Sequence, residues 1–348
     1  MTAPASPAPI WELINGFAAY RALCAAIELG VFDHIAAADG ESLDLDGLNA
    51  AIGAADSADL VLLSELLVAL GLLDVDTAGL RLTPASARYL VSTSAASMVE
   101  LVRLSPGPRS GWDQLTATLR TGKVPAATAC ELVGFYPSLV RATAPTQAAV
   151  ARGVAEQLGK PQLIVDLGCG SGAWLSALLI ANPGATGIGV DLEEMATLAA
   201  ATAERAQLGE RLTTVVGDYL DVKLPVEQAD VVVLGHVLRA ESRERAAALV
   251  ARAVKLAGHA GVVVIADYFR PDPAERGSTQ DRNAVCASAK HELVLSLTMR
   301  ASTNGRGVSR SDITEWAAAC GAGIVAEFEP LPRQHVLLLR PHEWSAAR

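Results

Sequence analysis

A glycine-rich segment that follows an apolar run is the part of the sequence that most directly indicates chemistry. Residues 165–172 read Val-Asp-Leu-Gly-Cys-Gly-Ser-Gly, with Asp166 ending the apolar run and Gly168 and Gly170 after it. Glycines let the backbone turn sharply and approach a ligand with no Cβ in the way. A helix predicted from Ala173 would point its first N–H groups at the same ligand. The segment therefore predicts a binding loop for a cofactor that contains a nucleoside.

Carboxylates at the ends of the next two apolar runs strengthen this interpretation. Asp191, followed by Leu192, ends the second run 25 residues after Asp166. A carboxylate at that place can accept hydrogen bonds from the hydroxyls of a ribose. The third run is followed by Asp218 and Tyr219, a carboxylate and an aromatic ring where an adenine could rest.

The elements that must position these residues are strands that alternate with helices from residue 160 onward. Short continuous runs of Val and Ile are typical of strands buried on both faces, as in a parallel sheet between two layers of helices. The predicted strands are residues 162–166, 186–191, 212–216, 230–234, 261–267, 324–329 and 335–340, and the predicted helices begin near Ala173, Glu194, Arg243, Asp281 and Ser311. Residues 330–334 are too few for a crossover, so the last two strands should form an antiparallel hairpin.

The N-terminal part has a different pattern, with predicted helices at residues 10–38 (stopping at Gly30), 45–52 and 57–70 and a hairpin at 72–83. Helices followed by a two-stranded wing form the winged-helix arrangement, which can bind DNA. Residues 56–71 contain no Lys or Arg, and the net charge of the chain is −10. A DNA-reading helix presents basic or amide side chains. We therefore interpret this part as a packing or dimerisation module and expect no nucleic-acid partner.

Residues 84–150 are predicted to be helical, with interruptions at residues 105–108 and 122–126. This connecting region carries Phe135 and Tyr136 in a chain with only 4% aromatic residues. Ligands often bind in crevices between domains, so the two residues are candidates for a substrate site. The alternative is that they only pack the hinge.

Composition and cysteine spacing exclude several classes of protein. Hydrophobic residues make up 51% of the 348 residues and charged residues 19%, enough apolar material for two folded domains. The five cysteines include no CxxC pair, which indicates neither a disulfide framework nor a zinc site. The N-terminus does not resemble a secretory signal, and no apolar run reaches the roughly 18 residues of a membrane span. We expect a soluble, cytoplasmic protein without a membrane partner.

Taken together, residues 160–341 resemble the class I S-adenosylmethionine-dependent methyltransferases, with their seven-stranded sheet and antiparallel last strand. Residues 10–91 resemble the winged dimerisation domain of the caffeate-type O-methyltransferases and their bacterial relatives in secondary metabolism. The matching segments are Glu28-Leu29-Gly30-Val31-Phe32, Leu66–Leu73, Thr83-Pro84 and Arg88-Tyr89-Leu90.

This resemblance implies an α/β fold with three parts. A mostly helical, winged-helix-like dimerisation domain (residues 1–100) and a helical connector lining the cleft (residues 101–155) would precede a Rossmann-like, seven-stranded catalytic domain (residues 156–348). It also implies a homodimer that methylates a small natural-product acceptor with S-adenosylmethionine as cofactor.

The resemblance also assigns parts of the cofactor to the positions that match the family's motif. The implied contacts are Asp166, Gly168 and Gly170 with the methionine part, Asp191 and Leu192 with the ribose, Asp218 and Tyr219 with the adenine, and Gly235 and His236 with the sulfonium side.

The sequence departs from the family where the family carries its general base. In the family, a His within a Leu-His-Asp-Trp stretch deprotonates the acceptor hydroxyl, whereas this chain has Leu238-Arg239-Ala240-Glu241. Arginine keeps its proton throughout the working pH range and cannot be a base. It can bind a carboxylate or a phenolate, so Arg239 is a candidate for both catalysis and substrate binding.

Four interpretations of Arg239 stay open at this point. The acceptor arrives ionised and Arg239 holds the anion; the acceptor atom is a nitrogen or an activated carbon; another residue is the base; or the protein binds the cofactor and catalyses a different reaction. The candidates for another base are His236, expected one helical turn before Arg239, and His291 in a predicted helix.

Two weaker patterns complete the candidate site. Some relatives that methylate carbon beside a ketone bind iron, and His236, His291 and Glu292 could imitate that site, but their geometry is unknown and no metal is predicted. Residues 303–307 read Thr-Asn-Gly-Arg-Gly and resemble a loop that borders the family's acceptor pocket. Asn304 is therefore a further candidate for substrate binding, with a solvent-exposed loop as the alternative.

Overall fold

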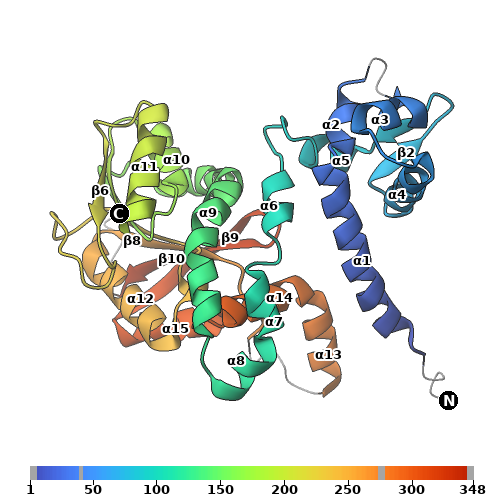
Figure 1. The fold of residues 1–348 in the computed structure, drawn as a ribbon. Helices are drawn as coiled ribbons and strands as arrows, with labels where there is room; N and C mark the ends of the chain where they lie inside the picture. The colour runs from blue at the N-terminus through green and yellow to red at the C-terminus, as the bar shows by residue number, and fades with distance from the viewer. Residues whose placement is uncertain (1–5, 39–41, 273–278, 343–348) are drawn as a thin grey trace. The chain divides into compact units, whose positions relative to one another are not determined.

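The computed structural model describes residues 6–38, 42–272 and 279–342 (Figure 1). The chain divides into two compact units, Met1–Ser105 and Pro106–Arg348. The helices that follow residue 105 therefore belong to the second unit. In the described ranges, no helix is both long enough and apolar enough to cross a bilayer.

The first unit is mainly helical. Its helices are α1 (Ala8–Glu28), α2 (Val31–Ala36), α3 (Leu45–Ile52), α4 (Ser57–Ala69), α5 (Pro84–Tyr89) and α6 (Val99–Leu104). The predicted wing is present as β2 (Leu73–Val75) and β3 (Leu80–Leu82), but β1 (Ser42–Leu43) pairs with β3 as a third strand. The prediction of a two-stranded wing was therefore incomplete, because a strand of two residues has no readable periodicity.

The second unit contains a seven-stranded sheet in the order β6-β5-β4-β7-β8-β10-β9. Its strands are β4 (Leu163–Leu167), β5 (Thr186–Asp191), β6 (Leu212–Val216), β7 (Val231–Gly235), β8 (Val262–Asp267), β9 (Ala322–Leu331) and β10 (Gln334–Pro341). The first five pair in parallel, and β10 lies antiparallel between β8 and β9. The seven predicted strands and the final hairpin are thus confirmed.

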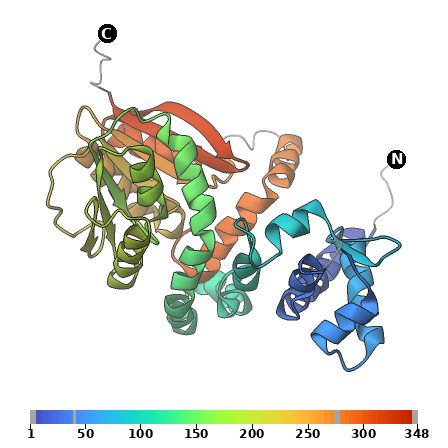
Figure 2. The same ribbon diagram turned by 90° about the horizontal axis from the view of Figure 1, so that it is seen from above.

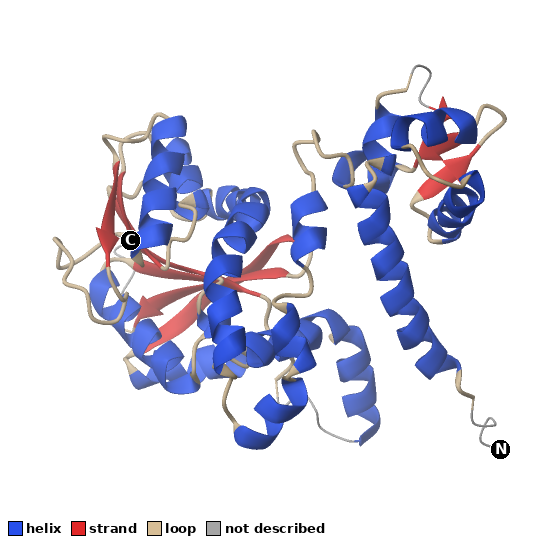
Figure 3. Ribbon diagram, viewed as in Figure 1, coloured by secondary structure: helices blue, strands red, loops and turns tan. Residues whose placement is uncertain are grey.

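Helices lie on both faces of this sheet (Figure 3). The helices of the second unit are α7 (Arg109–Asp113), α8 (Leu115–Thr121), α9 (Ala126–Ala155), α10 (Ala173–Ala181), α11 (Glu193–Arg205), α12 (Arg243–Ala257), α13 (Thr279–Ser288), α14 (Lys290–Ser302) and α15 (Arg310–Ala319), with the 3-10 turn η1 (Leu238–Ala240). Both views show the long α9 running beside the sheet (Figure 1, Figure 2).

Successive side chains of each central strand enter different cores. On β4, Ile164 packs in the cluster that contains residues of α9 and α10, whereas Val165 packs in the cluster that contains residues of α12 and α15. Alternation of this kind follows from the two-residue period of a strand. Because both faces are covered, each strand needs apolar residues at consecutive positions, which explains the continuous Val and Ile runs.

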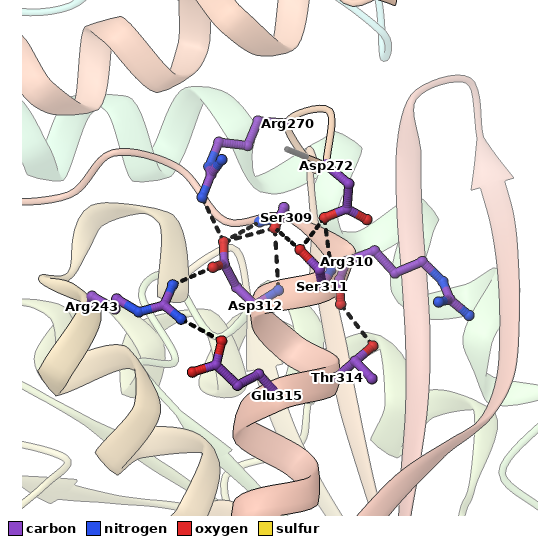
Figure 4. A network of polar contacts seen from close by, with 9 residues as sticks. All are labelled: Arg243, Arg270, Asp272, Ser309, Arg310, Ser311, Asp312, Thr314 and Glu315. Atoms are coloured by element: carbon purple, nitrogen blue, oxygen red, sulfur yellow. Dashed lines mark hydrogen bonds and ion pairs between the residues drawn. The ribbon is translucent and has the colours of Figure 1, made fainter. Parts of the chain in front are cut away.

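A buried carboxylate ties α15 to two neighbouring segments (Figure 4). Asp312 accepts a hydrogen bond from the backbone N–H of Ser309 at 2.9 Å and forms ion pairs with Arg243 and with Arg270. Its side chain is 9% exposed, whereas Glu315, the other partner of Arg243, is 68% exposed. Asp312 therefore joins the start of α15 to α12 and to the segment after β8.

Because of this burial, we expect Asp312→Ala to lower the free energy of unfolding by about 3 kcal/mol, since it removes the carboxylate from Arg270 and from a helix N-terminus and leaves Arg243 with only the exposed Glu315. Glu315→Ala removes an exposed partner of the same arginine and should cost about 0–1 kcal/mol. Urea denaturation of both variants and of the wild-type chain measures the difference. Equal losses of unfolding free energy in the two variants would contradict a larger contribution from the buried carboxylate.

Candidate active site

The glycine loop connects β4 to α10, where the sequence predicted it. Gly168, Gly170 and Gly172 have φ values of 87°, 53° and 73°. At Gly172 a Cβ would lie 3.2 Å from the Cα of Ala199 in α11, so a larger residue would force α10 and α11 apart. The backbone N–H groups of Gly168 and of the next residue donate to the carbonyl of Val190 at 2.8 and 3.1 Å. The loop is therefore fixed to β5.

Two buried carboxylates lie at the carboxyl ends of the neighbouring strands β4 and β5. Asp191 accepts hydrogen bonds from the backbone N–H groups of Gly170 and Leu192, both at 2.8 Å. Asp166 is 1% exposed, and neither of its carboxylate oxygens has a partner among the described residues. Burial and the charge of Asp191 raise the pKa of Asp166 to about 8. A cationic ligand would stabilise this pair.

A polar cluster holds the two residues that follow β6. Asp218 accepts hydrogen bonds from Nη2 of Arg245 at 2.9 and 3.1 Å, and the hydroxyl of Tyr219 donates to Glu241. The guanidinium carbon of Arg245 lies 5.8 Å from the centroid of the Tyr219 ring, and Nε of Arg245 donates to Glu241 at 2.6 Å. The sequence identified Asp218 and Tyr219 but gave no indication of the two residues that orient them.

His236 has a left-handed backbone, with φ of 62°. The expected helical turn from His236 to Arg239 is therefore wrong, and only η1 forms a 3-10 turn there. Nε2 of His236 lies 2.7 Å from Oε1 of Gln334, and its Nδ1 is buried with no partner in the described part of the chain. Burial and the charge of Arg239 lower the pKa of His236 to about 3. An imidazole with so low a pKa is a poor general base at neutral pH.

Gly235, the residue before His236, lies directly against an indole ring. A Cβ at Gly235 would lie 2.6 Å from Nε1 of Trp174 in α10. This nitrogen is buried, and no described residue accepts its hydrogen. The centroids of the Trp174 and His236 rings are 6.3 Å apart, so the unpartnered indole N–H and the unpartnered Nδ1 of His236 belong to the same part of the site.

Arg239 lies beside a carboxylate and an aromatic ring. Its Nε is 3.7 Å from Oδ1 of Asp267 at the end of β8, and its guanidinium carbon is 5.2 Å from the centroid of the Tyr268 ring. Its side chain is 18% exposed, and its Nη1 has no partner within the described ranges. Burial raises the pKa of Asp267 to about 6, although Arg239 lowers it. The arginine is thus only partly neutralised and keeps a free donor.

The other proposed base and the residue after it have different surroundings. The ring of His291 on α14 packs edge-on against Tyr268, with centroids 5.6 Å apart. Glu292 instead forms an ion pair with Arg333 at 2.8 Å. Among the residues that the structure describes, no three His, Cys, Asp or Glu side chains are grouped as metal ligands.

The candidate substrate residues fall in two places. Tyr136 on α9 is 43% exposed, and desolvation by the surrounding protein and the charge of Asp191 raise its pKa to about 12, while Arg239 acts in the opposite direction. Phe135 precedes it and is partly buried. Asn304 is exposed and lines a small pocket of about 110 Å³ beside the network of Figure 4, and this pocket includes neither His236 nor Arg239.

Besides Glu241 and Arg245, sequence reasoning missed Asp267, Tyr268 and Gln334. Asp267 ends a parallel strand just as Asp191 does, so the rule that found the earlier carboxylates could have found it and its neighbour. Gln334 reaches the site only because β10 pairs with β8, with His335 opposite Asp267. No local signal marks it.

Comparison with known proteins identifies both units. Residues 11–92 match the O-methyltransferase dimerisation domain, and residues 146–323, just over half of the chain, match the O-methyltransferase domain. The chain belongs to the O-methyltransferase family. It is an S-adenosylmethionine-dependent methyltransferase, and S-adenosylmethionine is its cofactor.

Relatives of this O-methyltransferase match along nearly its whole length. It is 28% identical over 327 residues to the tetracenomycin polyketide synthesis 8-O-methyl transferase of Streptomyces glaucescens, covering 90% of this chain and 91% of the relative. A solved O-methyltransferase of neocarzinostatin biosynthesis, in complex with S-adenosylmethionine and 2-hydroxy-5-methyl naphthoic acid, is 27% identical with a TM-score of 0.64, covering 92% of this chain and 95% of that one. Human N-acetylserotonin methyltransferase shares the fold at 23% identity and a TM-score of 0.77, covering 98% and 99%.

Proposed function

We propose that the protein transfers the methyl group of S-adenosylmethionine to an oxygen that a small aromatic acceptor presents as an anion, and that Arg239 holds this anion. The observation that carries the proposal is the buried Nη1 of Arg239, which has no partner among the described residues. Arg239 stands where the family's general base is expected. We infer an acceptor from bacterial secondary metabolism.

The relatives support an acidic aromatic acceptor. One acts in tetracenomycin polyketide synthesis, and the solved complex from neocarzinostatin biosynthesis holds a hydroxy-naphthoic acid. In such an acid the carboxylate carries the negative charge at neutral pH and gives a guanidinium an anion to hold, whereas the neighbouring hydroxyl becomes an anion only after it has released its own proton to water. The planar fork of a guanidinium suits such a group, because it can donate two parallel hydrogen bonds to a carboxylate or one to a phenolate.

The buried carboxylates suit the cofactor's charges. S-adenosylmethionine supplies an electrophilic methyl group on a sulfonium and also carries an ammonium. Asp166, whose carboxylate oxygens have no partner among the residues that the structure describes, lies beside Gly168 and Gly170 and would accept hydrogen bonds from the ammonium. Asp191 receives two backbone hydrogen bonds and keeps lone pairs for the ribose hydroxyls, next to Leu192.

The remaining cofactor contacts lie on the next two strands. Asp218 and Tyr219, held by Arg245 and Glu241, would flank the adenine. Gly235, which packs against the Trp174 ring at the end of β7, would approach the sulfonium side with its backbone. These placements extend the assignments that the family resemblance implies.

The reaction then needs no general base. A lone pair of the acceptor oxygen forms the new C–O bond while the C–S bond breaks, and the sulfur leaves with the electron pair as a thioether. An oxygen that is already anionic has no proton to lose. Arg239 favours that anion by its charge, which acts strongly in a partly buried site. Methylation removes the negative charge from the oxygen, so the product is held less tightly.

Transfer of an isotopically labelled methyl group tests this function. We expect that incubation with 4-nitrophenol, whose hydroxyl ionises near neutral pH, and cofactor labelled with ¹³C in its methyl group places the label on the phenol oxygen, as read by mass spectrometry and NMR. Phenol, whose hydroxyl keeps its proton at neutral pH, should be a poor acceptor at the same concentration. Label on carbon, or equal rates for the two compounds, would contradict an anionic oxygen acceptor.

We also propose that the protein is a homodimer through its first unit. The N-terminal half of α1 exposes apolar side chains to 52–69%, namely Ile10, Trp11, Leu13, Ile14 and Phe17. A contiguous apolar stripe of this kind is unfavourable in water and is typical of a protein interface. Light scattering should give twice the chain mass of 36.1 kDa. A monomer at assay concentration would contradict this.

A further inference from the structure

We propose that Tyr268 is a second hydrogen-bond donor to the anionic acceptor oxygen, and that Gln334 is the positioning residue that directs the hydroxyl proton of Tyr268 toward it. This inference rests on the proposed function. The three linked side chains are His236 at the end of β7, Gln334 at the start of β10 and Tyr268 just after β8. They meet because β10 lies antiparallel beside β8.

The direction of each hydrogen bond follows from the atoms involved. Oε1 of Gln334 can only accept, so the imidazole of His236 donates from Nε2 across 2.7 Å. The amide nitrogen of Gln334 can only donate, so the hydroxyl oxygen of Tyr268 accepts. A hydroxyl that accepts in this way keeps its own proton for another partner. Within the described part of the chain, that proton has no protein acceptor.

The protonation states of the end groups agree with this direction. Burial and the charge of Arg239 lower the pKa of His236 to about 3, so its ring is neutral with one N–H, and Nδ1 carries the lone pair. Burial raises the pKa of Tyr268, so its hydroxyl stays protonated and able to donate. Gln334 is 3% exposed, so water competes little for its amide.

Tyr268 and Arg239 are placed to act on the same group. The guanidinium carbon of Arg239 lies 5.2 Å from the centroid of the Tyr268 ring. Tyr268 is partly exposed, whereas Asp267 before it is completely buried. Two donors directed at one oxygen anion stabilise it more than one and disfavour a protonated amine in its place. This would select an anionic oxygen as the acceptor atom.

Gln334→Glu tests the direction of the chain, because a carboxylate accepts from both neighbours and turns the Tyr268 proton away from the acceptor. We use the full chain with bound S-adenosylhomocysteine and 4-nitrophenolate as the probe. In ¹⁵N NMR of the imidazole, His236 should be the neutral Nε2–H form in the wild type and protonated below about pH 6 in the variant. The affinity for 4-nitrophenolate, read from its visible absorbance, should fall about tenfold or more.

Two further variants separate this effect from added charge and from misfolding. Gln157→Glu adds the same charge at an exposed position and should change neither measurement. Tyr268→Phe should weaken 4-nitrophenolate binding by about tenfold and leave His236 as the Nε2–H form.

Three results would overturn the proposal. The first is that His236 of the wild type carries its proton on Nδ1. The second is that Tyr268→Phe binds 4-nitrophenolate with unchanged affinity, and the third is that the wild type does not bind 4-nitrophenolate. The His236 form is read without turnover, so its failure is distinguishable from a failure of labelled methyl transfer.

Discussion

Arg239→Met should reduce kcat/KM for an acidic aromatic acceptor by about 100-fold or more, which is about 3 kcal/mol, and leave the dissociation constant of S-adenosylmethionine unchanged. Methionine keeps an unbranched stem but removes the charge and the free Nη1 donor of Arg239. The loss should appear mainly in the acceptor KM if Arg239 holds the anion before transfer. Initial rates and titration calorimetry measure the two quantities.

The pH dependence of the Arg239 variant distinguishes an electrostatic role from a structural one. In the wild type, the positive charge lowers the pKa of the bound hydroxyl, so the anion is present at neutral pH. Without it, the rate of Arg239→Met should recover toward alkaline pH, where the acceptor ionises unaided. Arg239→Lys keeps the charge and should keep the wild-type profile at a reduced rate. A uniform loss at every pH would contradict this role.

Asp267 supplies a second control, because it loses its cation in the same variant. Its folded-state pKa is about 6 against an ordinary value of 3.8, even though Arg239 lowers it. Without Arg239 this pKa rises further, and Asp267 takes up a proton at neutral pH rather than staying buried as a charge. Both chains lose stability through Asp267 as pH rises from about 4 to about 6, but above about 6 only the variant continues to lose it, so the stability loss of Arg239→Met relative to the wild type should grow above about pH 6. Arg239→Met with Asp267→Asn should regain stability but not activity.

The strands of the second unit could be predicted because each one is marked by its own run of consecutive apolar residues. A parallel strand covered on both faces needs consecutive apolar residues, and the runs at β4, β7 and β8 show them. The hairpin of β9 and β10 followed from a connection too short to cross the sheet. In contrast, β1 has two residues and is held only by its pairing with β3, so nothing in its own sequence predicts it.

In the candidate site, too, the residues that could be predicted are those whose positions follow from local sequence. Asp166 and Asp191 could be predicted because parallel strands place their carboxyl ends at one edge of a sheet. The left-handed backbone of His236 could not be predicted, since residues other than glycine rarely adopt this conformation and nothing in the local sequence indicates it. The position of Gln334 in the site is set by the register of β10 against β8. This register depends on two distant segments, so neither segment predicts it alone. Sequence reasoning therefore missed the contacts between distant segments. These contacts set the protonation states of the polar side chains in the site and the direction of their hydrogen bonds.

Asp166→Asn should stabilise the cofactor-free protein at neutral pH. Burial raises the folded-state pKa of Asp166 to about 8 from 3.8, so at pH 7 the folded chain holds a proton that the unfolded chain has released. Stability therefore falls as pH rises from about 4 to about 8. Asparagine does not titrate and avoids this cost, about 1–4 kcal/mol at pH 7. Urea denaturation should show a gain that disappears toward about pH 4.

Asp166→Asn should also bind the cofactor more weakly, because the variant lacks the carboxylate that pairs with the cofactor's ammonium. In the wild type at pH 7, the cofactor's ammonium draws Asp166 into its ionised form, so binding releases close to one proton and the affinity rises by up to about tenfold per pH unit below pH 8. Asp166→Asn should release none and lose about 10–100-fold in affinity. Calorimetry in two buffers of different ionisation enthalpy counts the protons, with Asp221→Asn, an exposed carboxylate, as the matched control. Binding of the wild type without proton release would mean that Asp166 stays protonated and that another group holds the ammonium. If proton release is observed, Asp166 has two linked effects. Its buried carboxylate destabilises the cofactor-free protein, and its ionisation makes cofactor binding depend on pH.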